Sequence, residues 1–267
     1  MRIRTIALNT FGSLVRDKLL IVFAILFTCV ILLMMTPLLG MKAMTTASNM
    51  QQEQSVILEL VSVIIFMVSG CGSLLAAWLA ANSVATELKS GTVLAVMARP
   101  VKRWEFLAGK FVGVMLLMSL YVVMMFFLGY LLAWLGGQKI QSTPWVLLVY
   151  PLVRYAIYSA MAMTLVTVLH PLVSWGIVIL VAVGAKITAP SVSVAKPALR
   201  WIKEIVYVIL PSTGLLSEDR FLTIKDASLR QATWLEHLTT LSYGLDYAFV
   251  FLLLAMWSFH YRSLKRD

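Results

Sequence analysis

The sequence predicts an all-α, polytopic membrane protein with six membrane-spanning helices. Hydrophobic residues make up 61% of its 267 residues, and charged residues only 13%. A soluble domain carries about 25% charged residues, so this composition is typical of helices that are buried in a bilayer. The apolar residues also fall into long runs separated by polar segments. Such runs match the ~20 residues that a helix needs to cross ~30 Å of hydrocarbon.

The amino-terminal segment, residues 1–18, predicts an amphipathic helix ahead of the first span. Apolar side chains recur in it at helical spacing, whereas Arg2, Arg4, Arg16 and Lys18 are charged. A basic amphipathic helix of this kind lies on the inner leaflet of a membrane. The alternative is a simple basic anchor in front of the first span. A cleaved signal peptide fits less well, because the apolar run that follows is too long.

The first three spans are expected at residues 19–41, 60–86 and 111–138, none of which contains a charged residue. The second run is rich in small residues, which let another helix approach closely. The third run is entered through Gly109 and Gly113, a spacing that also permits close packing between helices. These contacts could lie within one subunit or across a dimer, and the sequence leaves that choice open.

The last three spans are expected at residues 145–169, 172–189 and 241–261. A long outer loop, residues 190–240, precedes the final span. Its one apolar run, residues 205–216, is too short to cross the membrane and predicts a re-entrant segment. The loop is large enough to bind an extracytoplasmic partner.

Positive charge predicts the orientation of the chain. The two short outer loops hold only Lys42 and Lys139. The bases assigned to the cytoplasmic side lie in the amino terminus, the central loop and the carboxyl terminus, and the six bases of the long outer segment are offset by five acids. Because Lys and Arg accumulate in cytoplasmic loops, both termini are expected in the cytoplasm. The net charge of +10 therefore indicates inner loops beside anionic lipid, and not a nucleic-acid-binding surface.

The loop between the second and third spans, residues 87–105, is the main functional feature of the sequence. After Glu87, Gly91 can end the preceding helix, and Thr92 can begin a short apolar helix that stops at an Arg-Pro break. The result is a compact cytoplasmic protrusion with an apolar face, and such a face indicates a partner. The alternative is a plain solvated connection.

Motifs of common enzyme chemistry are missing from the sequence. It has no phosphate-binding GxxxxGK[ST] motif, so the chain is not expected to hydrolyse ATP itself. His170, His237 and His260 are scattered at span ends and form no metal-binding motif. Cys29 and Cys71 lie in apolar runs and are expected to be reduced, buried thiols. The prediction is a transport subunit, not an enzyme, that binds no metal or cofactor.

Arg154 is the most notable charge within a predicted span. Charges at membrane depth are costly and usually face a cavity or a partner. In one interpretation, Arg154 lies on a substrate path and meets an anionic group. In the other, its side chain reaches the outer headgroups.

The central loop resembles the first cytoplasmic loop of bacterial ABC-2-type exporter permeases. The matching loop residues are Glu87, Gly91, Thr92, Arg99, Pro100, Val101, Arg103, Trp104, Phe106, Leu107, Gly109 and Lys110. The connecting-helix region of the same group is matched by Asn9, Thr10, Phe11, Arg16, Asp17 and Lys18. The six-span layout extends the resemblance over the whole chain, which is most similar to single-domain permeases that pair with a separate ATPase.

The resemblance implies a permease in the cytoplasmic (inner) membrane of a bacterium. Its implied partners are two ABC ATPase subunits, which bind ATP and Mg²⁺, and a second permease copy or a homologous permease. The residues implied to couple it to the ATPase are Glu87, Gly91, Thr92, Arg99, Pro100 and Arg103. The substrate does not follow, because the group exports lipids, polysaccharides, peptides, drugs and ions.

Two other functions are weighed against this one. A secondary transporter would need ionisable groups near mid-membrane to couple transport to protons or sodium, and most of the spans have no acidic residue. A membrane scaffold, or an assembly subunit of a larger complex, would need no ATPase at all.

Overall fold

The computed structural model describes residues 2–18, 69–88, 102–135, 144–188 and 234–261, together with a few single positions. Within these residues every regular element is helical and no strand occurs, which confirms the all-α prediction there. Most of the first predicted span and of the re-entrant run lies outside the described residues, as does the tip of the central loop.

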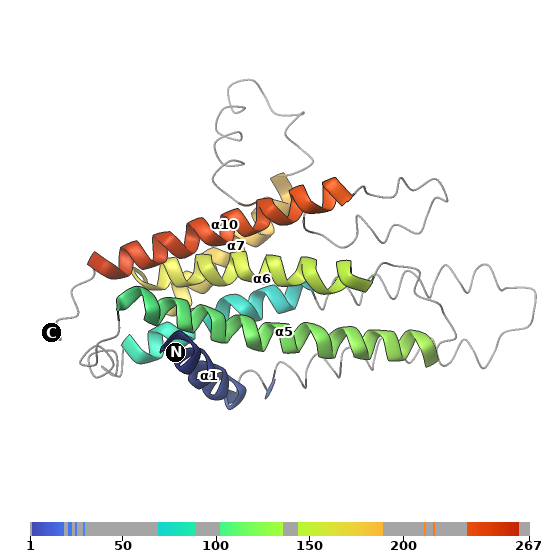
Figure 1. The fold of residues 1–267 in the computed structure, drawn as a ribbon, viewed down its shortest axis with the longest axis horizontal. Helices are drawn as coiled ribbons and strands as arrows, with labels where there is room; N and C mark the ends of the chain where they lie inside the picture. The colour runs from blue at the N-terminus through green and yellow to red at the C-terminus, as the bar shows by residue number, and fades with distance from the viewer. Residues whose placement is uncertain are drawn as a thin grey trace, which may run out of the picture.

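Five helices are labelled in Figure 1, and a further helical segment covers residues 69–88. The labelled helices are α1 (Arg2–Val15), α5 (Arg103–Leu135), α6 (Pro144–Val166), α7 (Pro171–Thr188) and α10 (Trp234–Tyr261). α6 packs against α5, α7 and α10, and α1 packs against α5. α5, α6 and α10 form the long axis of the bundle, and α1 crosses it obliquely near one end (Figure 1).

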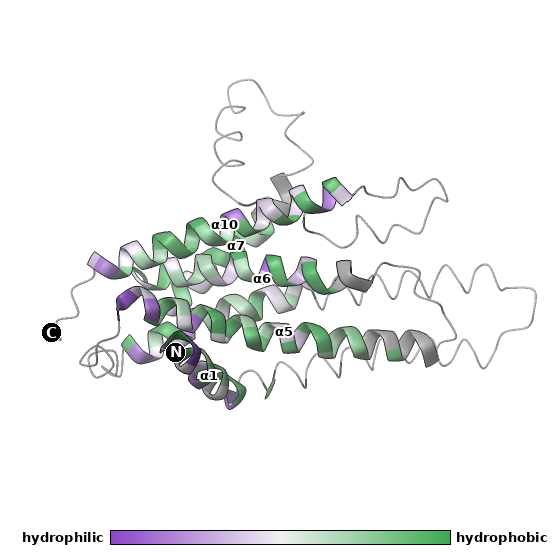
Figure 2. Cartoon of the chain, in the orientation of Figure 1, coloured by the Kyte–Doolittle hydropathy of each residue, from purple (hydrophilic) through white to green (hydrophobic). Residues whose placement is uncertain are grey.

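Three of the helices contain stretches that are long and apolar enough to cross a membrane. These stretches are Arg103–Phe127, Leu148–Val166 and Trp234–Tyr261. α7 adds a shorter apolar stretch, Pro171–Val183. Apolar residues cover the middle of the bundle, whereas hydrophilic residues gather toward the helix ends (Figure 2). The structure is therefore that of a helical membrane protein, and these stretches fall on the third to sixth predicted spans.

α5 begins at Arg103, well before the expected start of the third span at residue 111. The carboxylate of Glu105 accepts a hydrogen bond of 2.9 Å from the backbone N–H of Lys102. The carbonyl of Lys102 in turn accepts a bond of 3.2 Å from Phe106 N–H. This is the geometry of a helix cap, in which the third helical residue accepts from the backbone N–H of the capping residue just before the helix. Hydropathy marks only the apolar part of the helix, so the sequence prediction missed its polar first turns.

α10 also begins early, at Trp234, within the segment that was expected to be an outer loop. Glu236 lies in its first turn, where a negative charge is favourable. The side chain of His237 meets the core, because its Nδ1 lies 2.7 Å from the hydroxyl of Tyr150 on α6. The helix therefore extends beyond residues 241–261, the mainly apolar stretch that the sequence analysis used to define the sixth span.

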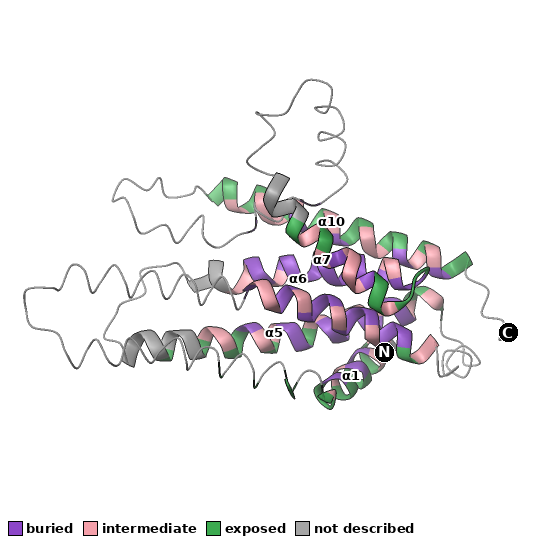
Figure 3. Cartoon of the chain, turned by 180° about the vertical axis from the view of Figure 1, so that it is seen from behind, coloured by how far each residue is buried: buried purple, intermediate pink, exposed green. Residues whose placement is uncertain are grey.

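α6 is the most enclosed helix of the bundle (Figure 3). Its buried large side chains include Tyr150, Tyr155, Ile157 and Met163. α6 thus forms the core against which the neighbouring helices pack.

α1 lies within residues 1–18, the segment that was predicted to be an amphipathic helix on the membrane surface, and its buried face contacts protein. Ala7, Thr10 and Leu14 recur along one side of α1 and are all buried. A Cβ atom added to Gly113 of α5 would lie 2.7 Å from the carbonyl oxygen of Ala7, and one added to Gly109 would lie 2.7 Å from Ile6 Cγ2. The predicted glycine pair therefore brings α1 against α5 within one subunit.

The two cysteines are free thiols in different surroundings. Cys71 is half-buried, whereas Cys29 is exposed. The prediction that both thiols are buried was therefore wrong for Cys29. An apolar run in a membrane protein has a face that points away from the rest of the chain, and hydropathy does not reveal that face.

Candidate coupling site

The predicted coupling residues divide into two groups. Gly91, Thr92, Arg99 and Pro100 lie outside the described residues. Glu87 lies near the end of helical segment 69–88, and Arg103 begins α5. The described part of the site is therefore the pair of helix ends from which the loop leaves the bundle.

Glu87 forms an ion pair with Lys110 of α5, in which Lys110 Nζ contacts Glu87 Oε1. The Lys110 side chain is 6% exposed, and that of Glu87 is 28% exposed. The Lys110 ammonium also lies 5.7 Å from the centre of the Phe106 ring, within the range of a cation–π contact. A buried charge is costly without its partner, so this pair resists separation.

Arg103 reaches the carboxyl-terminal end of α10. Its Nη1 donates hydrogen bonds to the carbonyl oxygens of Phe259, at 3.2 Å, and His260, at 2.7 Å. The last carbonyls of a helix have no partner within the helix and carry partial negative charge. The Arg103 guanidinium therefore caps α10 both by hydrogen bonding and by charge.

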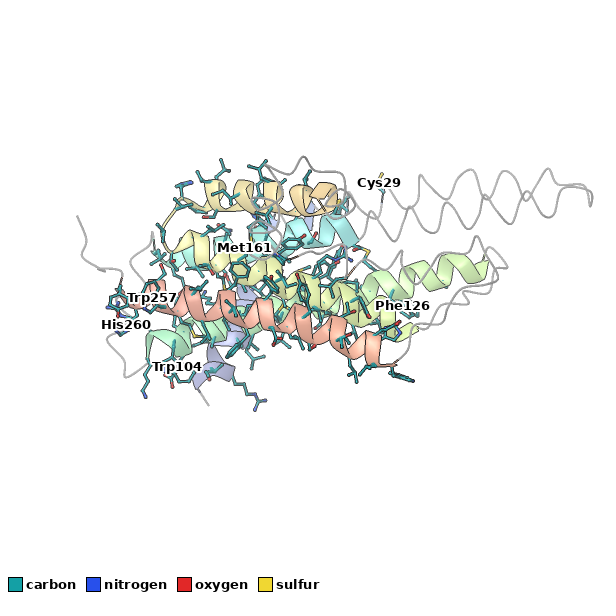
Figure 4. The ribbon with its side chains drawn as sticks, turned by 90° about the horizontal axis from the view of Figure 1, so that it is seen from above. Cys29, Trp104, Phe126, Met161, Trp257 and His260 are labelled. Carbon is teal, nitrogen blue, oxygen red and sulfur yellow. The ribbon has the colours of Figure 1, made fainter. Side chains whose placement is uncertain are left out.

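An aromatic contact strengthens the link between α5 and α10. The rings of Phe106 and Phe259 stack with centroids 5.9 Å apart and planes inclined by 20°. Both side chains are almost completely buried. Trp104, Trp257 and His260 lie at the same end of the bundle (Figure 4). The polar and aromatic contacts thus join α5 to the last turn of α10.

Lys110 is the residue of this site to which the sequence analysis gave no role of its own. It was counted with the bases of the central loop, yet the structure buries it on α5. One signal was present, because an acid ends one uncharged run and a base precedes the next. Adjacent antiparallel helices bring such boundary residues to the same depth.

Arg154 lies on the enclosed helix α6 and is 5% exposed. Its side chain is therefore surrounded by protein of the same chain. This burial fits poorly with a side chain that spreads into the outer headgroups. It fits better with the general expectation that a membrane charge is held by protein contacts.

Polar side chains also tie α6 to α10. The hydroxyl of Thr164 donates to the carbonyls of Phe251, at 2.7 Å, and Ala160, at 2.9 Å. Directly after the end of α6, the hydroxyl of Thr167 donates to that of Ser258, at 2.8 Å. Hydrogen bonds between helices hold membrane bundles together where the hydrophobic effect cannot. Movement of α10 is therefore linked to α6 at two depths.

Metal-ligating groups were sought in the part of the chain that the structure describes. No group of three or more His, Cys, Asp and Glu residues lies close enough there to hold a metal ion. His237 instead contacts Tyr150, and His170 Nδ1 accepts a hydrogen bond of 3.4 Å from the N–H of Leu172.

Comparison with known families decides what kind of protein this is. The family model described as "ABC-2 family transporter protein" matches residues 4–264. The chain belongs to this family. No curated protein matches it significantly. Membership confirms the resemblance drawn from the central loop and implies an ABC ATPase as partner of this ABC-2 permease.

Proposed function

We propose that this ABC-2 permease is the membrane subunit of an ATP-driven exporter in the cytoplasmic membrane of a bacterium. Two separate ABC ATPase subunits bind ATP and Mg²⁺, and a second copy of the chain or a homologous permease completes the transport path. The family match over residues 4–264 carries this proposal. The sequence is in keeping with it, since it carries no phosphate-binding motif of its own.

The loop between segment 69–88 and α5 is the proposed docking site for the ATPase. Gly91, Thr92, Arg99 and Pro100 form its docking part, and Glu87 and Arg103 are the coupling residues at its two stems. The observation in favour is the set of contacts that these stems make with α5 and α10. A force on the loop would therefore reach the membrane bundle directly.

Two further parts of the chain have proposed roles. Arg154 is a candidate contact for an anionic group of the substrate, because a buried cation attracts negative charge. The outer segment that precedes α10 is a candidate site for an extracytoplasmic partner. Both roles depend on the assembled exporter.

Co-purification with an ABC ATPase tests the proposal. The tagged permease is purified from the membranes of its own bacterium, and the ABC ATPase retained on it is measured. The variant Arg99→Glu reverses a charge in the loop, and we expect it to lower the retained ATPase by about tenfold or more, since loss of an interfacial charge pair costs 2–5 kcal/mol.

The matched control is Lys139→Glu, which makes the same charge change in a predicted outer loop. It should retain as much ATPase as the unmodified chain. Equal retention by Arg99→Glu would contradict docking through the loop. Absence of any bound ATPase from the unmodified complex would contradict the proposed function itself.

A further inference from the structure

The two stems of the proposed coupling loop are joined to each other inside the bundle. Glu87 lies near the end of helical segment 69–88, which enters the loop. Lys110 lies about two turns into α5, the helix that leaves the loop. Their side chains form an ion pair. The loop is thus closed at its base by charge and not only by the packing of apolar side chains.

The same helix end is also joined to α10, far away in the sequence. Arg103 caps the carbonyls of Phe259 and His260, and Phe106 stacks on Phe259. Lys110 lies against the other side of this cluster through its contact with the Phe106 ring. Together with the Glu87–Lys110 ion pair, these contacts form a continuous clasp, defined here as Glu87, Lys110, Phe106, Arg103 and Phe259.

Burial makes the clasp rigid. Lys110 is 5% exposed, Phe106 is 1% exposed and Phe259 is fully buried. Because the Lys110 side chain is almost fully covered, its pair with the partly exposed Glu87 is screened by salt much less than a surface ion pair. Opening the clasp would leave a charge in an apolar setting, so the three helix ends are held together as a unit.

We propose that Lys110 is a positioning residue that makes segment 69–88, α5 and α10 move together when the loop is pushed. This inference rests on the proposed function, because it concerns how a push from the ATPase spreads into the membrane. Without the clasp, segment 69–88 and α5 could move apart when the loop is displaced, and α10 would then stay in place. With it, movement of the loop displaces the last turn of α10.

The hydrogen bonds of α10 indicate that a displacement of this helix would also affect α6. Ser258 adjoins Phe259 in the sequence and shares a hydrogen bond with Thr167, which directly follows α6. Thr164 of α6 donates to the carbonyl of Phe251, about two turns further along α10. A displacement of the last turn of α10 would therefore be passed to the central helix α6.

A spin label on α10 tests the inference in the complete complex. Trp257 is 62% exposed and lies two positions before Phe259, so Trp257→Cys gives a label site beside the clasp. Cys29→Ser and Cys71→Ser remove the native thiols. The complex with its ATPase is reconstituted in lipid nanodiscs, and the spectrum without nucleotide is compared with that after trapping by ATP and vanadate.

The nucleotide-dependent spectral change should depend on Lys110. Lys110→Met should reduce the change about fivefold or more, as expected when a coupling between sites is lost, while the ATPase stays bound. Lys110→Arg keeps the charge and should preserve the change. The exchanged pair Glu87→Lys with Lys110→Glu should restore most of it, because the ion pair can form in reverse.

Tyr150→Phe is the matched control, since it removes a buried hydrogen bond at the opposite end of the bundle. It should leave the spectral change intact. An undiminished change in Lys110→Met would overturn the inference, as would a folded exchanged pair that fails to respond. If Lys110→Met does not fold, the exchanged pair and Lys110→Arg decide the matter. A bound ATPase with no response in the unmodified complex would count against the clasp and the proposed function together.

Discussion

At Gly244 the absence of a side chain sets how closely α10 approaches α6. A Cβ atom at this position would lie 2.4 Å from Cγ1 of Val153, much closer than two carbon atoms can approach. Val153 is β-branched and has little rotamer freedom in a helix, so it cannot easily move aside. The contact lies between the Tyr150–His237 and Thr164–Phe251 hydrogen bonds and belongs to the same interface.

Gly244→Ala is therefore expected to destabilise the bundle by about 1–3 kcal/mol, the usual cost of overpacking. Thermal unfolding of the purified permease in detergent measures the effect as a lower midpoint. Val153→Ala in the same chain removes the clashing methyl groups and should recover most of the loss. Gly176→Ala is the control, because nothing lies within 4 Å of a Cβ atom there. Equal stability of Gly244→Ala and Gly176→Ala would contradict the close contact.

Residue-scale reasoning from the sequence identified Glu87 and Arg103 but not their partners. Both residues stood out because they match the loop of the family that the sequence resembles, and Glu87 also follows directly on an uncharged run. Arg103, however, contacts His260 at the end of α10, which is far away in the sequence. Only the folded structure shows that these two residues are neighbours. The burial of Lys110 could not be predicted either, because it depends on the aromatic side chains that cover it.

At the scale of elements, hydropathy located the helices better than their ends. The bounds of α6 and α7 lie close to the predicted spans, because a tight turn or a proline limits these helices. α5 and α10 extend into polar sequence, where caps and charged first turns stabilise the helix. Such contacts are local, yet they do not change the length of an uncharged run. The run therefore defines the membrane part of an element and not the whole element.

The packing of α1 against α5 is predicted to depend on the small size of Gly113. A Cβ atom on Gly113 would lie 2.7 Å from a backbone carbonyl of α1, which no side-chain rotation can relieve. Gly113→Ala should therefore separate α1 from α5 while leaving α1 helical in part. Hydrogen exchange followed by mass spectrometry should show faster exchange over Arg2–Val15.

Gly12→Ala is the control for this experiment, since Gly12 lies on α1 itself with open space around it. That change adds helix propensity and should not speed exchange. Unchanged protection of α1 in Gly113→Ala would mean that α1 does not depend on its contact with α5.

At the scale of the whole molecule, the ends of the bundle differ in chemistry. One end collects Arg103, Glu87 and Lys110, whereas the other holds the Tyr150–His237 contact. Large apolar side chains, among them Phe127, Leu180 and Phe249, are exposed along the sides. In a membrane such side chains face lipid or another transmembrane helix. The charged end is expected to face the cytoplasm, because positive residues accumulate there.

The orientation predicts opposite labelling of two tryptophan positions. Trp104, which is 46% exposed, lies at the charged end, and Trp234, which is 71% exposed, begins α10 at the other end. In a chain without native cysteines, a membrane-impermeant maleimide should label Trp234→Cys from outside spheroplasts, and Trp104→Cys only after the membrane is opened. Detergent should make both sites reactive, which controls for burial. The reverse pattern would place the proposed coupling loop on the wrong side of the membrane for a cytoplasmic ATPase.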